Sequence, residues 1–188
     1  NVTTGVFDCT TPTNTTLKMG SGTWTLSGTG SIWMFTNVVG AFYKGTANIV
    51  LSDTSTTARS FAGNGLSYNK LTIGGTTGTS TLTINSGNQF TELASTKTVA
   101  HTIALGSGTT STFGKWSVTG TVGNVVTVTG TATIIIAGAR VSGVDYLALG
   151  TTVISATSPG EFYAGANSTG GTNAILTAAP AGVTRYWV

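Results

Sequence analysis

The amino-acid sequence predicts an all-β protein, for which a parallel β-solenoid (β-helix) is the favoured architecture and a β-sandwich the alternative. Thr and Ser make up 58 of the 188 residues, and Gly adds 27 more. Thr, branched and aromatic residues favour strands, whereas Gly, Asn and Ser favour turns. Segments with alternating apolar side chains recur about every 10 residues, and helical periodicity is nearly absent. The hydrophobic share of 39% predicts a packed core rather than a disordered chain.

The alternating segments are the expected strands, and Gly, Asn or Ser stands at nearly every break between them. Their regular spacing is typical of a sandwich, a barrel or a solenoid. In chain order they span residues 23–28, 31–36, 48–53, 70–75, 80–85, 90–95, 101–106, 115–120, 125–130, 132–138, 145–150 and 152–157.

Similar neighbouring units favour the solenoid over the sandwich. Leu71, Phe90 and Trp116 are taken as one repeated core position, at intervals of 19 and 26 residues, which is the length of one solenoid coil. Low charge also fits, because stacked strands find ladder partners on both sides and need few surface ion pairs. A Greek-key sandwich produces a similar strand spacing and therefore remains the alternative.

The stretch "SFAGNGLSYNKLTIGG" at 60–75 has the glycine content of a ligand-binding loop. A phosphate-binding loop requires a helix directly behind its glycines. Here a β-rich run follows instead, ending at Gly74-Gly75. Asn64-Gly65 tolerates positive φ, so the sequence predicts a tight turn between strands.

The chain is expected to form one all-β repeat domain over residues 1–180, with a C-terminal tail at 181–188 that resembles the start of a further module. The uncharged stretch 125–138 is rich in β-branched residues and is expected to be covered, by its own coils or by partner chains. Ile135 within it is expected to be buried. Thr-x-Thr pairs are irregularly spaced, which argues against a regular threonine face of the kind that binds ice.

The charge pattern argues against nucleic-acid and membrane partners. Only 7% of the residues are charged, and the net charge is +3. Nucleic-acid binding requires a dense basic surface, whereas the cations here are scattered along the chain. No apolar run is long enough to span a membrane. The cations are Lys18, Lys44, Arg59, Lys70, Lys97, Lys115, Arg140 and Arg185.

Catalytic chemistry has few groups available, so no enzyme activity, catalytic residue, cofactor site or metal site is predicted. His101 and Cys9 are the single histidine and cysteine, too few for a zinc site. Both are expected to be structural. Glycoside cleavage requires paired carboxylates, and only Asp145 and Glu161 are candidates for being brought together by neighbouring coils. The carboxylates are Asp8, Asp53, Glu92, Asp145 and Glu161.

Several stretches resemble the Thr/Gly-rich β-repeat proteins of tailed bacteriophages, which occur as fibre, spike and decoration proteins. The resembling stretches are "GSGTWTLSGTGSIW" (20–33), "SFAGNGLSYNKLTIGG" (60–75), "VSGVDYLALGTT" (141–152), "EFYAGANSTGG" (161–171) and "TRYWV" (184–188). Lys70 stands where such proteins often repeat Asn.

The resemblance implies a non-enzymatic structural protein at the surface of a virion, either in a tail fibre or spike or in capsid decoration. Its implied role is as a scaffold or in host attachment. Its implied partners are other virion proteins, further copies of the same chain, as a trimer, and a host surface glycan. A bacterial cell-surface adhesin and a polysaccharide-degrading tailspike are the alternatives.

Overall fold

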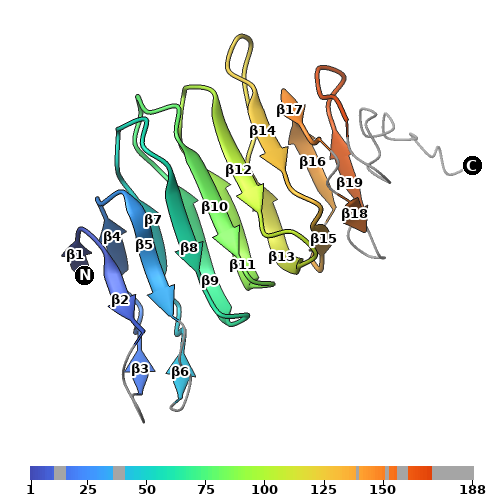
Figure 1. Ribbon diagram of the computed structural model, residues 1–188. Coiled ribbons are helices and arrows are strands. Elements are labelled where there is room, and N and C mark those ends of the chain that lie inside the picture. The colour runs from blue at the N-terminus through green and yellow to red at the C-terminus, as the bar shows by residue number, and fades with distance from the viewer. Residues whose placement is uncertain (11–15, 36–40, 139, 151–152, 156–160, 171–188) are drawn as a thin grey trace, which may run out of the picture.

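The computed structural model describes residues 1–10, 16–35, 41–138, 140–150, 153–155 and 161–170. These residues form a parallel β-solenoid of about six turns, and they contain strands but no helix (Figure 1). The predicted all-β class and the preference for a solenoid are confirmed. The expected tail at 181–188 lies outside the described residues.

The first face of the solenoid, called sheet A here, is an eight-stranded sheet whose neighbouring strands all pair in parallel. Its strands, in spatial order, are β1 (Val2–Thr4), β4 (Thr23–Leu26), β7 (Asn48–Leu51), β9 (Ser67–Ile73), β11 (Gln89–Ser95), β13 (Thr110–Ser117), β15 (Thr133–Ile136) and β18 (Val153–Ser155).

The second face, called sheet B here, has seven parallel strands. They are β2 (Phe7–Cys9), β5 (Gly30–Phe35), β8 (Arg59–Ala62), β10 (Thr81–Asn85), β12 (His101–Leu105), β14 (Val126–Thr129) and β17 (Leu147–Ala148). Two further pairs complete the described strands: β3 (Leu17–Lys18) with β6 (Phe42–Tyr43), and β16 (Val141–Val144) with β19 (Phe162–Ala164).

The strand register gives the coil length and corrects one part of the sequence interpretation. Ile49, Leu71, Leu93 and Trp116 lie in one row across sheet A, at intervals of 22, 22 and 23 residues. Placing Phe90 in the row of Leu71 and Trp116 was therefore wrong. Phe90 pairs with the neighbouring aromatic residues of β9 and β13, because each of these strands carries two separate buried rows.

The predicted turn at Asn64-Gly65 is confirmed, and it links a strand of sheet B to the next strand of sheet A. Both residues have positive φ, 55° and 71°. The Leu66 amide donates to the Gly63 carbonyl at 3.1 Å and closes the turn. The fully buried Asn88 of the following coil accepts the Gly65 amide at 3.1 Å. The glycines of this stretch therefore turn the chain and let successive coils stack.

The core fills the space between the two sheets with alternate side chains of each strand. Ile134 and Ile136 are fully buried, whereas Ile135 between them faces outward and is only partly buried. The expectation that Ile135 is buried was wrong, because its neighbours, rather than Ile135 itself, point into the coil. Aromatic rings stack along the core, among them Phe90 and Phe113, whose centroids lie 5.7 Å apart.

Threonines on the outside of sheet B form a row that their sequence spacing does not suggest. Thr81, Thr102 and Thr127 are register partners in β10, β12 and β14, although they lie 21 and 25 residues apart. Loops of different length absorb the unequal spacing. The Thr-x-Thr pair itself is not repeated in β12, where Ala104 is the register partner of Thr83 and Thr129, so the expectation that no regular Thr-x-Thr face forms agrees with these three coils.

Candidate functional site: a groove on the outer face of sheet A

The outer face of sheet A is bent where three neighbouring strands break the alternation of side chains. In β11, Phe90 and Leu93 are buried, whereas Thr91 and Glu92 between them both lie on the outer side. β9 and β13 repeat this pattern in register. Two consecutive outward residues bend a strand locally, as a β-bulge does. The aligned bends therefore follow the solenoid axis.

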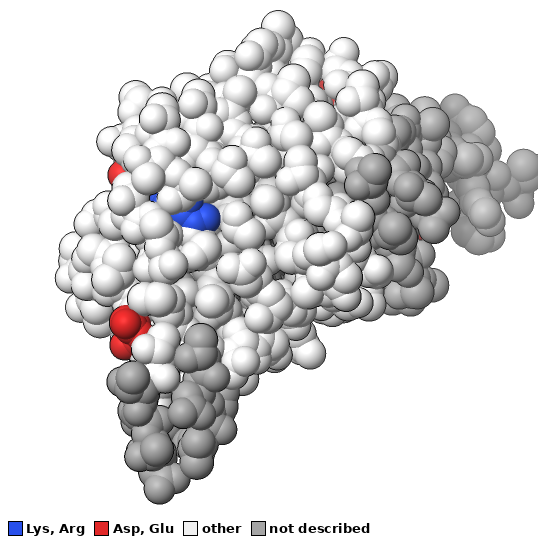
Figure 2. Space-filling model, viewed as in Figure 1, with Lys and Arg blue, Asp and Glu red and all other residues white. Residues whose placement is uncertain are grey.

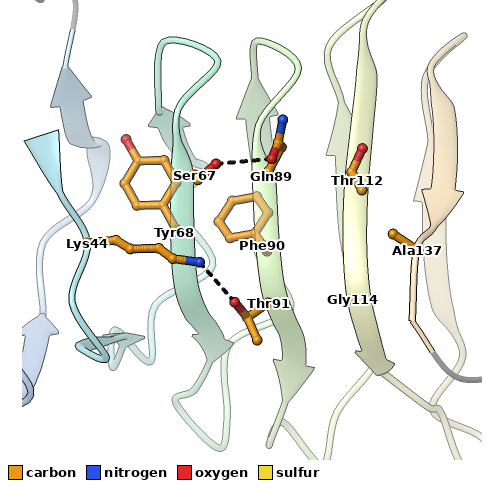
Figure 3. A pocket seen from close by; sticks show the side chains of 9 residues that line it. All are labelled: Lys44, Ser67, Tyr68, Gln89, Phe90, Thr91, Thr112, Gly114 and Ala137. Atoms are coloured by element: carbon orange, nitrogen blue, oxygen red, sulfur yellow. Dashed lines mark hydrogen bonds between the residues drawn. The ribbon is translucent and has the colours of Figure 1, made fainter.

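A groove with a volume of about 250 Å³ lies along this bend (Figure 3). The Lys44 side chain extends across the groove, and its ammonium donates to Thr91 Oγ1 at 3.2 Å, although the two residues are 47 positions apart in the chain. Ser67 Oγ donates to Gln89 Oε1 at 3.0 Å on the far side. The full lining is Lys44, Ser67, Tyr68, Gln89, Phe90, Thr91, Thr112, Gly114 and Ala137.

The groove therefore combines one cation with hydroxyl and amide groups around buried aromatic residues. Tyr68 and Phe90 are almost fully buried, and their rings stack with centroids 5.5 Å apart. A larger residue at Gly114 would clash with the neighbouring strand, since a Cβ there would lie 2.8 Å from the Thr91 carbonyl oxygen. Such a surface offers hydrogen bonds and one positive charge to a polar ligand.

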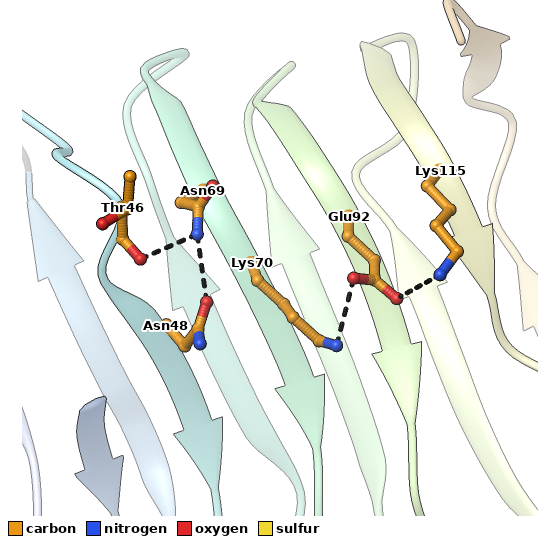
Figure 4. A network of polar contacts seen from close by, with 6 residues as sticks. All are labelled: Thr46, Asn48, Asn69, Lys70, Glu92 and Lys115. Atoms are coloured by element: carbon orange, nitrogen blue, oxygen red, sulfur yellow. Dashed lines mark hydrogen bonds and ion pairs between the residues drawn. The ribbon is translucent and has the colours of Figure 1, made fainter. Parts of the chain in front are cut away.

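A row of charged side chains runs beside the groove on the same face (Figure 4). Glu92 accepts Lys70 at 3.0 Å through Oε2 and Lys115 at 3.3 Å through Oε1. Burial raises the pKa of Glu92, but hydrogen bonds from Ser117 and Lys70, together with the Lys70 charge, hold it below its ordinary value. Glu92 is therefore ionised at neutral pH and neutralises only one of its two lysine partners.

An amide network extends this row toward the preceding coil. Asn69 Nδ2 donates to the Thr46 carbonyl at 2.9 Å and to Asn48 Oδ1 at 3.0 Å (Figure 4). These contacts hold β9, the strand that carries Lys70, against the preceding coil. Sequence reasoning treated the cations as scattered and missed this cluster. The 22- and 23-residue spacing of Lys70, Glu92 and Lys115 would have identified it, had the coil length been known.

His101, the single histidine, lies at the start of β12 and is 4% exposed. Its Nδ1 lies 2.9 Å from the Val99 carbonyl oxygen and its Nε2 lies 3.0 Å from Ser95 Oγ. Burial is the main cause that lowers the pKa of His101, so the ring is neutral at pH 7. A neutral ring with Nδ1–H toward Val99 accepts the Ser95 hydroxyl, and these contacts tie β11 to β12.

The carboxylates that the sequence suggested as a pair lie apart. Asp145 follows β16 and accepts the Asn167 side-chain amide at 2.7 Å. This hydrogen bond is the main reason that the pKa of Asp145 is lowered. Glu161 precedes β19, where it pairs with Arg140 at 3.3 Å. Because β16 and β19 are parallel, the two carboxylates sit at opposite ends of this small sheet.

Other groups with chemical potential have local roles. Asp8 accepts the Thr10 amide at 3.0 Å, and Asp53 accepts the Ser55 hydroxyl at 2.8 Å. Cys9 is a buried free thiol. Within the described ranges, no three His, Cys, Asp or Glu side chains come together as a metal site. Over the same ranges, no helix has the length and apolar character needed to cross a membrane.

Comparison with known proteins adds no relative. No family model, curated protein or solved structure matches the chain.

Proposed function

We propose that this chain is a non-enzymatic virion structural protein of a bacteriophage, serving as a scaffold and in attachment to the host surface. The stretches that resemble phage β-repeat proteins support the origin. The solenoid supports the scaffold role, because a continuous parallel ladder with one core makes a stiff rod. The alternative is a bacterial cell-surface adhesin built from similar repeats.

The groove on sheet A is the observation that carries the attachment role. Lys44, Thr91 and Gln89 present an ammonium, a hydroxyl and an amide at one shallow surface. A host surface glycan offers many hydroxyl groups, which such donors and acceptors match. The surplus positive charge beside Glu92 favours glycans that carry carboxylates.

A polysaccharide-degrading tailspike receives less support from the geometry. Cleavage with two carboxylates requires both at one glycosidic bond, roughly 5–10 Å apart. Asp145 and Glu161 instead hold separate local contacts at the two ends of the β16–β19 pair. We therefore propose binding without cleavage.

The attachment role is tested by binding the purified chain to arrayed bacterial glycans, with and without uronic or sialic acids. We expect binding to the acidic glycans, and we expect Lys44→Met to weaken it at least tenfold, a loss of about 1.4 kcal/mol. Thr127→Val on sheet B is the matched control and should bind as the parent chain does. If Lys44→Met bound acidic glycans as tightly as the parent chain, the groove would be excluded as the glycan-binding site.

The virion role needs a separate test, because an adhesin would also bind glycans. Antibodies against the chain should label purified phage particles in electron micrographs. Labelling of uninfected cells instead would favour the adhesin. Labelling of neither would contradict both roles.

A further inference from the structure

A buried cluster of polar side chains lies at the corner where the chain passes from sheet A to sheet B. Arg59, Ser80, Lys97 and His101 come from three consecutive coils and are 2%, 2%, 8% and 4% exposed. The cluster is separate from the groove, and the proposed function makes no use of it.

Arg59 is the member whose hydrogen bonds are incomplete. Its Nη2 donates to Ser80 Oγ at 2.7 Å. Its Nε and Nη1 are buried and have no hydrogen-bond partner among the residues that the structure describes. A guanidinium keeps its charge at every ordinary pH, so Arg59 cannot become neutral to relieve its burial. A buried charged donor without a partner is strongly unfavourable.

The position of Arg59 in the ladder explains why space remains beside it. Its register partner in the following coil is Leu82, and its partner in the preceding coil is Gly30. A Cβ placed on Gly30 would meet no atom within 4 Å. An open surface depression of about 240 Å³ lies on the outer side of sheet B at this point, and its lining is Gly30, Ser31, Ala58, Arg59, Ser60 and Thr83.

The charges of the corner do not balance. Lys97 Nζ donates to the Gly78 carbonyl at 2.8 Å, a neutral partner. Burial and then the Arg59 charge lower the pKa of Lys97, and Asp53 is the carboxylate that acts in the opposite direction. Arg59 and Lys97 each carry a positive charge, Asp53 carries one negative charge, and His101 is neutral. One positive charge is therefore left without a counterpart.

We propose that this corner binds a small monovalent anion, of which chloride is the simplest, through the free N–H groups of Arg59. One such anion balances the surplus charge and accepts the two unpaired donors. A phosphate or sulfate would bring more negative charge than the corner lacks. The anion binds the folded coils alone, so it stabilises the stack by mass action.

Crystallography with bromide in place of chloride locates the anion directly. We expect an anomalous bromide peak within hydrogen-bonding distance of Arg59 Nε or Nη1. Density for water alone at this position, without an anomalous peak, would overturn the proposal.

Thermal unfolding provides the second test, at constant ionic strength with chloride replacing gluconate. We expect a saturable rise in the melting temperature of roughly 2–4 °C for the parent chain. Arg59→Leu should abolish this dependence and still fold, because Leu82 already occupies the matching position of the next coil. Arg140→Leu is the control, since Arg140 is 51% exposed and should leave the dependence unchanged. An unaltered chloride dependence in Arg59→Leu would also overturn the proposal.

Discussion

The two outer faces of the solenoid share one core and one kind of ladder, yet their side chains differ. Sheet A carries the charged row of Lys70, Glu92 and Lys115 and the groove under Lys44. From β5 to β17, the outward side chains of sheet B that the structure describes carry no charge, and the face drawn in Figure 2 shows few charged atoms. The outward side chains of sheet B over this range are Ser31, Met34, Ser60, Ala62, Thr81, Thr83, Asn85, Thr102, Ala104, Thr127, Thr129 and Ala148.

This difference separates what the fold requires from what it leaves free. Most inward positions are apolar because they fill the coil, whereas outward positions only need to suit a strand. The charges concentrated on sheet A are therefore not a requirement of the fold. A face without charged side chains suits close contact with a second copy of the chain, because identical uncharged faces do not repel each other.

The largest expected effect tests which side chains of β15 point inward. Ile134→Asp should destabilise the fold by at least about 4 kcal/mol, because it buries an unpaired charge in the core. Ile135→Asp on the outer side of sheet A should cost about 1 kcal/mol or less. Urea unfolding of both variants measures the difference. Equal costs would mean that the assignment of inward and outward residues in β15 is wrong.

The next effect concerns assembly. The trimer is implied by the phage resemblance alone, and we expect sheet B to contribute its contacts. Thr127→Glu places like charges on each copy and should weaken self-association at least tenfold. Thr133→Glu is the matched change on sheet A and should leave association unaltered. Sedimentation of the parent chain and of the two variants measures self-association, and a monomeric parent chain would refute the assembly proposal.

Local patterns in the sequence predicted the fold class and most long strands. The segment expected at 80–85 is the strand Thr81–Asn85, and that expected at 101–106 is His101–Leu105. The strand Arg59–Ala62 was missed because it begins with a charged residue, whose side chain the corner buries. Short strands such as Val2–Thr4 hold too few residues to show alternation.

The candidate site could not be predicted in the same way. Lys44 and Thr91 meet across two coils, and only the three-dimensional stacking brings them together. Loop lengths that vary between coils hide the register from any fixed sequence spacing. Phe90 was assigned to the wrong row because β9, β11 and β13 each carry two buried rows, and the Lys70–Glu92–Lys115 row was missed because the coil length of 22 to 23 residues was not known.

The smallest expected effect compares one residue from each face. Glu92→Gln should destabilise the fold by about 1 kcal/mol, because it removes the negative charge that two lysines share, although Lys115 is 68% exposed and screened by solvent. Thr102→Val on sheet B should change stability by less than about 0.5 kcal/mol. Added salt should shrink the Glu92 effect and leave that of Thr102 unchanged.

The pH dependence of stability shows whether the charge of Glu92 stabilises the fold. The folded pKa of Glu92 lies below its unfolded value, so its contribution to stability is fully present above the unfolded pKa of about 4.3 and is lost as the pH falls through the folded pKa. The stability difference between the parent chain and Glu92→Gln, measured by urea unfolding from pH 6 downward, should therefore narrow below about pH 4.3. Thr102→Val has no titrating group at the changed position and should follow the parent chain throughout. A Glu92 difference that stayed constant to pH 3 would mean that the carboxylate charge is not what stabilises this face.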